Sequence, residues 1–344
     1  LNQPDISQNL ATLLAGSAYQ VVNRDLAREH YESTLASMGL AGGVYVTADG
    51  TYQITKTLVS IDSAFSTPSS SSPYATGIPF GIGSGLFYKG VDVDGGLLFY
   101  TITDRGANAD SPSINLGEGA TSATKVFITP DFVPSLAVVK YKNGRSEVIQ
   151  RTLLKVAGGS TVTGLPLPSG MTGSSLEVPL ATNLMPIRQA NQAIRYDING
   201  IDPEGVALDK EGMAWICDEY GPFIAKVNPN TGEILSKYIA GAQINGLPAV
   251  LSNRIPNRGM EGIAVAETGK VYAVVQSTLE IKKTVNSVKY DTSKTALFTR
   301  IVELDPITGL TKMYAYPINS GYSKAKDAKL GDIVAIPNSN GKKF

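Results

Sequence analysis

From Gly81 to the last residue, short apolar runs alternate with turns that contain Gly, Asn and Asp. Runs of this length between turn residues are typical of β-strands. Two stretches share one pattern: residues 203–221 read PEGVALDKEGMAWICDEYG, and residues 260–278 read MEGIAVAETGKVYAVVQST. In each, Glu-Gly opens an apolar run, a charged residue and a Gly mark a turn, and a second apolar run follows. The chain therefore contains a repeated β-hairpin.

The two copies agree in register as well as in composition. Glu219 follows Glu204 by the same number of residues as Gln276 follows Glu261. A third copy, residues 83–106, has Ser84 in place of the glutamate, and a fourth, residues 331–344, stops partway.

A second hairpin follows each of the first three copies, with NPNTG and DPITG as corresponding turns in two of them. Two hairpins make four strands, and a four-stranded antiparallel sheet repeated around an axis is a β-propeller blade. We predict an all-β fold, a β-propeller of about 5–7 blades. The repeats are unevenly spaced, so we expect long loops between blades, such as residues 157–193.

The first part of the chain has a different pattern. Leu26, His30, Leu35 and Met38 lie near helical spacing, and the spacing predicts a short helix over residues 25–38. Residues 66–79 are rich in Ser and Pro and read as a loop. We divide the chain into a helical or extended segment, residues 1–43, and a propeller domain, residues 44–344, which we interpret as ending inside a blade.

Composition and charge argue against some classes of function. Thirty Lys and Arg balance thirty Asp and Glu, so a net charge of +0 gives no global field toward nucleic acid. No apolar run approaches the roughly 18 residues of a membrane span, and we expect no membrane insertion. The chain has one cysteine, Cys217, beside Trp215 and Ile216, which favours a buried and unreactive thiol. The single histidine, His30, has no evident catalytic partner.

Carboxylates stand at corresponding ends of the repeated hairpins. In a propeller, the first strand of each blade faces the central channel, so residues at the start of that strand and at the end of the next reach one channel mouth. We expect these side chains to form a ring of oxygen ligands: Asp104, Glu204, Asp218, Glu219, Glu261, Gln276 and Asp332. Like charges so placed repel one another unless a cation neutralises them. Ca²⁺ suits such a ring, because it takes several oxygen ligands, whereas zinc would need Cys or His.

The same residues carry a family resemblance. The motifs GSGLFY, TDRG, DPEGVALD, CDEYGP, NRGMEGIAV, VVQST and GDIVAIP resemble, in this order, those of the bacterial phytase-like domain family, described as having esterase-like activity of phytase. The resemblance runs from about Gly83 to the end. It implies a β-propeller, export to the periplasm, cell surface or medium, and a relation to calcium-dependent propeller phytases.

The resemblance also implies residue roles. It gives Asp104, Glu204, Glu219 and Glu261 as catalytic residues, Arg105 and Arg258 as substrate-binding residues, and a metal set of Glu204, Asp218, Glu219, Glu261 and Asp332. On this reading, Ca²⁺ held by the carboxylates activates water for attack on a small phosphorylated substrate.

Other functions remain open from the sequence. The Glu-Gly and Asp-Arg-Gly sequences can also have a purely structural role in hairpins. In that role, the acids cap backbone N–H groups or pair with the arginines. A non-catalytic exported module, at the cell surface or associated with filaments, is the alternative from a different class. A propeller lactonase or sugar-ester hydrolase using the same ring is a third. The sequence leaves both the oligomeric state and the presence of catalysis undecided.

Overall fold

The structure is a computed structural model, and it describes residues 44–47, 50–53, 81–116, 121–143, 145–319, 321–339 and 341–344. The helix predicted over residues 25–38, His30 and the Ser/Pro-rich loop lie outside these residues. Among the described residues, no helix has the length and hydropathy of a membrane span. The site residues all belong to one compact unit of the chain, and a separate hairpin, β1 (Val44–Thr47) with β2 (Gly50–Gln53), belongs to another.

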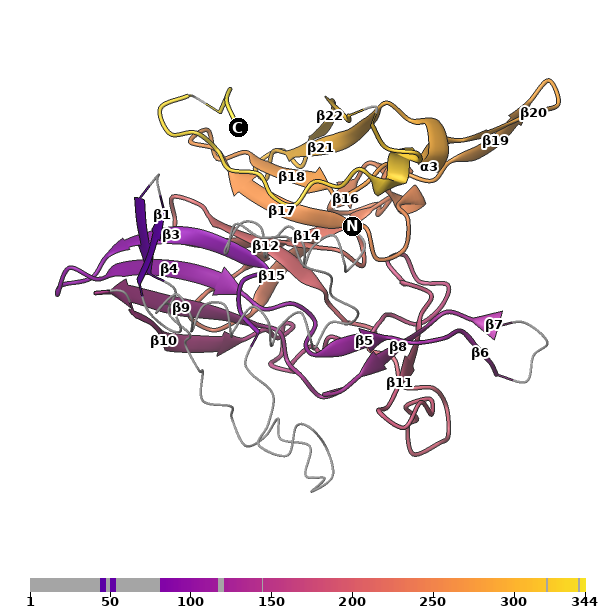
Figure 1. Cartoon of the computed structure of the whole chain (residues 1–344), viewed down its shortest axis with the longest axis horizontal. Coiled ribbons are helices and arrows are strands. Elements are labelled where there is room, and N and C mark those ends of the chain that lie inside the picture. Colours follow the sequence, from indigo (N-terminus) through magenta and orange to yellow (C-terminus); the bar gives the residue numbers. More distant parts are fainter. Residues whose placement is uncertain are drawn as a thin grey trace. The chain divides into compact units, whose positions relative to one another are not determined.

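The described fold is built of β-sheets, three of which contain a four-stranded blade unit (Figure 1). The first has the order β10-β9-β4-β3, with strands β3 (Gly85–Val91), β4 (Leu97–Ile102), β9 (Ser135–Lys142) and β10 (Arg145–Leu153). The second contains β12 (Pro203–Leu208), β13 (Ala214–Asp218), β14 (Phe223–Val227), β15 (Ile234–Ala240) and a short parallel strand, β16 (Gly246–Leu247). The third contains β17 (Met260–Val265), β18 (Val271–Val275), β21 (Phe298–Leu304) and β22 (Thr311–Pro317).

The second and third sheets follow the predicted repeat. In each, the four main strands are consecutive antiparallel neighbours within the sheet. The predicted turn glycines, Gly212 and Gly269, have φ of 78° and 81°, a conformation that favours glycine. The sheet architecture is that of propeller blades, while the number of blades and the closure of a ring remain predictions.

Smaller elements fill the connections. A three-stranded sheet of order β11-β8-β5 uses β5 (Asn108–Asp110), β8 (Thr124–Phe127) and β11 (Val178–Leu180), with β6 (Ile114–Asn115) and β7 (Thr121–Ser122) as a short hairpin. Between β18 and β21 the chain inserts β19 (Lys282–Val285), β20 (Val288–Asp291) and α3 (Thr292–Thr295). Two 3₁₀ turns, η2 (Ala249–Asn253) and η3 (Ala325–Asp327), complete the described elements. Between β10 and β12 only β11 is a strand, so the long loop expected here is confirmed.

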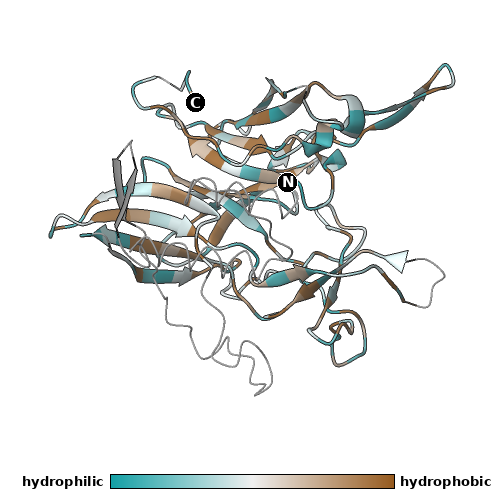
Figure 2. Ribbon diagram, viewed as in Figure 1, coloured by the Kyte–Doolittle hydropathy of each residue, from teal (hydrophilic) through white to brown (hydrophobic). Residues whose placement is uncertain are grey.

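The second sheet packs on both of its faces, and this packing holds strand β13 in place. Trp215 and Cys217 of β13 face an apolar cluster shared with Met260 and other residues of the third sheet. Their neighbour Ile216 faces a second cluster, which contains Ile102 of the first sheet. Alternate residues of a strand point to opposite faces, so β13 is buried throughout. Figure 2 shows the hydrophobic positions along β17 and β18, and β18 is buried throughout as well.

The last copy of the repeat differs from its prediction. Residues 331–336 run beside β17 but form no strand, although Ile333 and Ala335 pack in one apolar cluster and Val334 is exposed, as in a strand. Near the end of this copy, Ile336 N donates to Lys343 O at 3.0 Å.

Candidate metal centre

The starts of the inner strands lie against one another through glycines. A Cβ atom on Gly85 of β3 would lie 2.8 Å from Cα of Gly205 of β12, and one on Gly205 would lie 3.2 Å from Cα of Gly262 of β17. A Cβ on Gly262 would lie 2.5 Å from Cα of Asp332. Side chains at these glycines would collide with backbone, so glycine is needed for this close approach. The arrangement brings Glu204, Glu261 and Asp332 to one end of adjacent segments, as the repeat predicts.

Both glutamates occupy β-bulges. The pairing of β12 with β13 passes from Pro203 directly to Gly205, and the pairing of β17 with β18 passes from Met260 directly to Gly262. The residue skipped is Glu204 in one sheet and Glu261 in the other. A bulge bends the strand and redirects the side chain of its extra residue. A β-bulge therefore orients the glutamate in both repeats.

A carboxylate cluster lies at this end of the strands. Oxygen atoms of Asp104, Asp202 and Glu204 all lie within 4.8 Å of one another. Asp104 follows β4, Asp202 directly precedes β12, and Glu204 is the bulge residue of β12, so two backbone segments contribute. Three carboxylates this close repel one another strongly if all are ionised.

Asp202 is the least accessible of the three. The residue is 0% exposed, and neither Oδ1 nor Oδ2 has a hydrogen-bond partner. Its nearest counter-charge is Arg105, whose Nη1 lies 3.2 Å from Oδ2. Burial raises the pKa of Asp202 well above its usual range, the Arg105 charge opposes the shift, and the charge of Asp104 adds to it. Buried carboxylate oxygens without donors are rare in folded proteins and call for an explanation such as an ion.

Glu204 shares this environment. Burial, together with the charges of Asp104 and Glu261, raises the pKa of Glu204 to about 10. Without a cation, these raised pKa values would favour protonated carboxyl groups. A cation would supply the missing positive charge.

A second group of oxygens adjoins the cluster. Gln276 Nε2 donates to Glu219 Oε1 at 3.1 Å, while Gln276 Oε1 and Glu261 Oε2 are buried without hydrogen-bond partners. Burial and the Glu261 charge raise the pKa of Glu219 to about 8, and burial raises the pKa of Glu261. The unpartnered atoms of both groups are all acceptors.

This donor set fits a hard divalent cation. Ca²⁺ binds carboxylate and amide oxygens in flexible geometry, and both kinds are present here. Zinc fits poorly, because Cys217 is completely buried, and burial and the neighbouring carboxylates raise the pKa of its thiol. The prediction of a buried Cys217 is confirmed.

Asp218 holds the backbone around the cluster. Its Oδ2 accepts the backbone N–H of Asp202 at 2.6 Å, and its Oδ1 accepts that of Gly221 at 2.5 Å. Burial raises the pKa of Asp218 to about 7, while Lys237 and the two backbone donors oppose the shift. Both oxygens thus fix the backbone around the cluster, and a direct metal contact of Asp218 stays a prediction.

The two predicted substrate-binding arginines contact protein groups. Arg105 is 5% exposed, and its Nη1 donates to Asn257 at 2.8 Å and Tyr220 at 3.2 Å. The same nitrogen forms ion pairs with Asp202 and Glu177. Arg258 Nη1 donates to the backbone carbonyl of Lys326. The structure thus gives both arginines supporting contacts, and their binding of substrate remains a prediction.

Comparison with known proteins places the chain in a family. The family model described as "Phytase-like: Esterase-like activity of phytase" matches residues 78–341, which is more than half of the chain. The chain belongs to the phytase-like family. This match confirms the resemblance seen in the motifs, and no curated protein matches the chain.

Two solved structures are similar to this phytase-like chain at low identity. Virginiamycin B lyase from Staphylococcus aureus is 14% identical over 69% of this chain and 85% of its own, with a TM-score of 0.21. A mutant of the GH43 protein BlXynB from Bacillus licheniformis is 9% identical over 75% of this chain and 44% of its own, with a TM-score of 0.23. At these TM-scores, neither structure informs the function of the phytase-like chain.

The motif analysis left three residues of the phytase-like site unassigned. Asp202 corresponds in the repeat to Gly259, so comparison of the copies gave no acid at this position. Arg254 is buried, and its Nη2 donates to Ser174 O at 2.9 Å, a contact between segments far apart in sequence. Lys329, whose charge opposes the raised pKa of Glu219 and of Glu261, lies in a stretch without a motif. Of the three, only Asp202 had a visible signal, its place in the DPEG sequence.

Proposed function

We propose that the chain is a calcium-dependent hydrolase that cleaves a phosphate or carboxylic ester of a small anionic molecule at the carboxylate cluster. One observation carries the proposal: Asp202 is fully buried, lies within 4.8 Å of two further carboxylates, and has two oxygens that accept no hydrogen bond, with Arg105 as its nearest counter-charge. Family membership supports hydrolytic chemistry. Calcium, the substrate and export from the cell are parts of the proposal.

Some residues of the site would hold a cation, and others would support the residues that hold it. Asp104, Asp202 and Glu204 would bind Ca²⁺, with Glu261 and Gln276 offering further oxygens beside them. When bound, the cation polarises the ester and lowers the pKa of a coordinated water. Arg105 fixes Asp202 through their ion pair.

Glu219 is the best-placed group for proton transfer. Its pKa is raised to about 8 by burial and the Glu261 charge, so Glu219 exchanges protons near neutral pH. The hydrogen bond of 3.1 Å from Gln276 Nε2 orients Oε1 of Glu219. In the proposed reaction, Glu219 takes the proton of the attacking water or returns one to the leaving oxygen.

The test combines metal removal with two substrates. Protein treated with EDTA and then given Ca²⁺ or no metal is assayed with an aryl phosphate and an aryl ester, with Asp202→Asn as the matched variant. We expect turnover of one substrate that requires Ca²⁺ and is lost in Asp202→Asn. Calcium-dependent melting without turnover of either would favour a non-catalytic binding module instead. Turnover unaffected by EDTA would contradict the metal-dependent mechanism.

A further inference from the structure

One connection of the third sheet carries an inserted β-hairpin. In the second sheet, residues 219–222 join β13 to β14, whereas residues 276–297 join the corresponding strands, β18 and β21, of the third sheet. The longer connection contains β19, β20 and α3, and Figure 1 shows the β19–β20 hairpin projecting from the sheet. The second sheet forms without such an insertion, so the four-stranded unit does not require it.

The base of the hairpin is fixed, while its strands are exposed. Thr292 Oγ1 accepts the N–H of Ile281 at 2.8 Å and donates to Leu279 O at 2.5 Å. Glu280 N donates to Asn253 O at 2.8 Å. Beyond these bonds, all four residues of β19 and the first three of β20 are exposed. The hairpin therefore adds almost nothing to the core, and its side chains are accessible to a partner.

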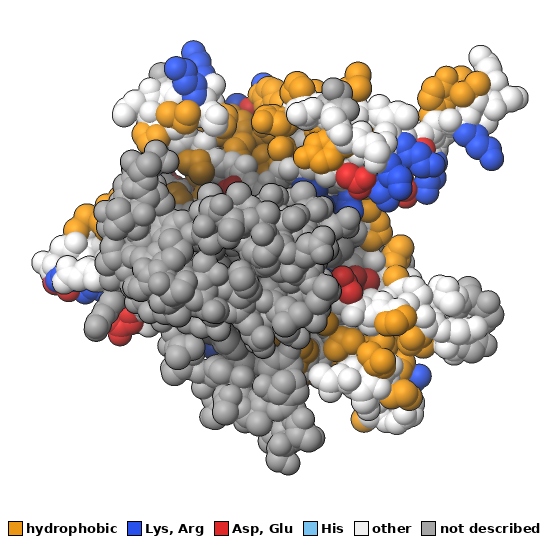
Figure 3. All heavy atoms as spheres, in the orientation of Figure 1, with side chains coloured by type: hydrophobic (Ala, Val, Ile, Leu, Met, Phe, Trp, Pro, Cys, Tyr) orange, Lys and Arg blue, Asp and Glu red, His pale blue; other side chains and the backbone are white. Residues whose placement is uncertain are grey.

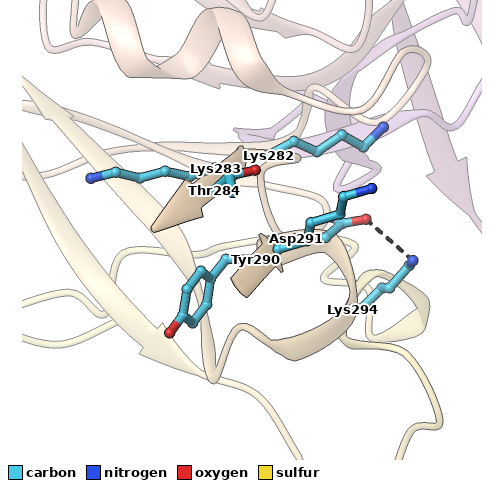
Figure 4. A pocket seen from close by; sticks show the side chains of 7 residues that line it. Lys282, Lys283, Thr284, Tyr290, Asp291 and Lys294 are labelled. Carbon is cyan, nitrogen blue, oxygen red and sulfur yellow. Dashed lines mark ion pairs between the residues drawn. The ribbon is translucent and has the colours of Figure 1, made fainter. Parts of the chain in front are cut away.

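Cationic side chains lie on both faces of the hairpin. Paired residues of two strands share a face, and the faces alternate along each strand. Lys282 and Lys289 therefore lie on one face, and Lys283 and Tyr290 lie on the other. Figure 4 shows Lys283 and Tyr290 directed to one side and Lys282 directed to the other. A partner lying flat on one face would leave the lysine charge of the other face unmatched.

The free end of the hairpin is apolar. Val285 and Val288 pair with each other beside the turn, and they are 38% and 53% exposed. The turn residues Asn286 and Ser287 have φ of 47° and 65°, as in the tight type I′ turns of two-residue hairpin loops. Figure 3 shows hydrophobic side chains toward the end of the hairpin and Lys or Arg side chains around its base at α3.

The hairpin and α3 carry an excess of positive charge. Residues 282–294 contain four lysines and one acid, Asp291, which pairs with Lys294 at 3.6 Å. Outside this range, Glu280 pairs with Lys282 at 3.1 Å. All four lysines line one hollow of about 320 Å³, which has room for a phosphate group. The region is thus locally basic, although the net charge of the chain is +0.

We propose that the β19–β20 hairpin binds the surface of an anionic lipid bilayer, with its apolar end in the headgroup layer. Lysines on both faces then meet lipid phosphates at the same time. A strand rises about 3.3 Å per residue, so Val285 lies about 7–10 Å beyond Lys283 and Lys282. Interfacial segments bury their apolar side chains to a similar depth, roughly 5–10 Å. Tyr290 suits this boundary, because its ring is apolar and its hydroxyl is polar.

The apolar end distinguishes a bilayer from other anionic partners. A nucleic acid or another soluble polyanion would use the lysines and leave Val285 and Val288 in water. A bilayer surface uses both features, because the less polar region lies directly beneath the charged headgroups. This contact is peripheral and needs no membrane-spanning helix. It is also independent of the proposed hydrolysis, because the hairpin contributes no residue to the carboxylate cluster.

Sedimentation with lipid vesicles tests the proposal. The chain is mixed, in EDTA, with vesicles of phosphatidylcholine and phosphatidylglycerol or of phosphatidylcholine alone, so that Ca²⁺ cannot bridge protein and lipid. We expect binding to the anionic vesicles, about tenfold or more weaker binding to the neutral ones, and weakening as salt is added. Absence of binding to the anionic vesicles, or equal binding to both kinds, would overturn the proposal.

A first variant tests the lysines. It replaces three hairpin lysines by glutamine, at Lys282, Lys283 and Lys289. The control makes the same charge change at three exposed lysines elsewhere, Lys210, Lys312 and Lys324. Each lysine near an anionic surface contributes about fivefold in affinity, so the hairpin variant should lose tenfold or more. The control should lose clearly less. Equal losses would show that overall charge, and not the hairpin, brings the chain to the vesicles.

A second variant tests the apolar end. Val285→Ser with Val288→Ser keeps every charge, and Ile244→Ser with Ile307→Ser is its control, at residues 83% and 91% exposed. We expect the valine variant to bind anionic vesicles about tenfold more weakly and the control to match the wild type. Urea unfolding establishes that each variant is folded. Wild-type affinity of the valine variant, or binding of a short DNA duplex as tight as that of the vesicles, would overturn the bilayer as the partner.

Discussion

The backbone N–H of Asp202 donates to the carboxylate of Asp218 at 2.6 Å, and this bond joins the two ends of the β12–β13 hairpin. Asp218 supports the backbone, while the Asp202 side chain remains available to the cluster. The two acids at the ends of this hairpin thus have different roles.

Replacement of Asp218 by Asn should mainly affect stability. Its two oxygens accept the N–H groups of Asp202 and Gly221, and an amide NH₂ in place of one oxygen would face a donor. We expect a loss of about 1–3 kcal/mol in the free energy of unfolding, measured with urea. Asp218→Asn as stable as the wild type, but unable to bind Ca²⁺, would instead show that Asp218 is a direct ligand.

The charge of Glu204 should give a pH dependence of stability in the metal-free protein. The native pKa of Glu204 is about 10, above its usual value, so the native state holds a proton that the unfolded state has released. The stability from this group is fully present below the unfolded pKa and is lost as pH rises through the native pKa, by at most about 1.4 kcal/mol per pH unit. We expect unfolding midpoints in EDTA to fall between about pH 5.5 and 8.5.

Glu204→Gln isolates this effect, since other groups titrate as well. The variant should lose part of the pH slope, keep the fold and bind Ca²⁺ more weakly. In the wild type, saturating Ca²⁺ should reverse the slope, because protons compete with the cation for the carboxylates. The assignment of the slope to this carboxyl would be wrong if wild type and Glu204→Gln had the same slope in EDTA.

Gly262 should be intolerant of a side chain. A Cβ there would lie 2.5 Å from Cα of Asp332, which is backbone and cannot rotate away. We expect Gly262→Ala to cost about 1–3 kcal/mol in urea unfolding. Gly331→Ala is the matched control, because a Cβ on Gly331 meets nothing within 4 Å. Similar stabilities of the two variants would show that β17 and the segment around Asp332 are not in close contact.

Local pattern was enough to predict the hairpins of the second and third sheets. Alternation and turn glycines are properties of neighbouring residues, and both copies carry them. The meeting of Glu204 with Glu261 also followed from the repeat, because equal registers place equal residues at the same end of their sheets.

Features that depend on distant segments could not be predicted in this way. The burial of Arg105 arises from Tyr220 and Asn257, more than a hundred positions along the chain. Asp202 has no acidic counterpart in the repeat, because the corresponding residue of the other copy is Gly259. Long-range packing, and not local pattern, decides which charged groups face the cluster.

Calcium titration of metal-free protein by calorimetry, with Asp202→Asn as the comparison, tests the central claim most directly. Asp202 has two buried oxygens without donors, and its replacement removes one charge at nearly constant shape. We predict saturable binding of Ca²⁺ to the wild type and at least tenfold weaker binding to a folded Asp202→Asn, which is about 1.4 kcal/mol or more. Absence of binding to the wild type, or equal affinities of the two proteins, would contradict a calcium site at this cluster.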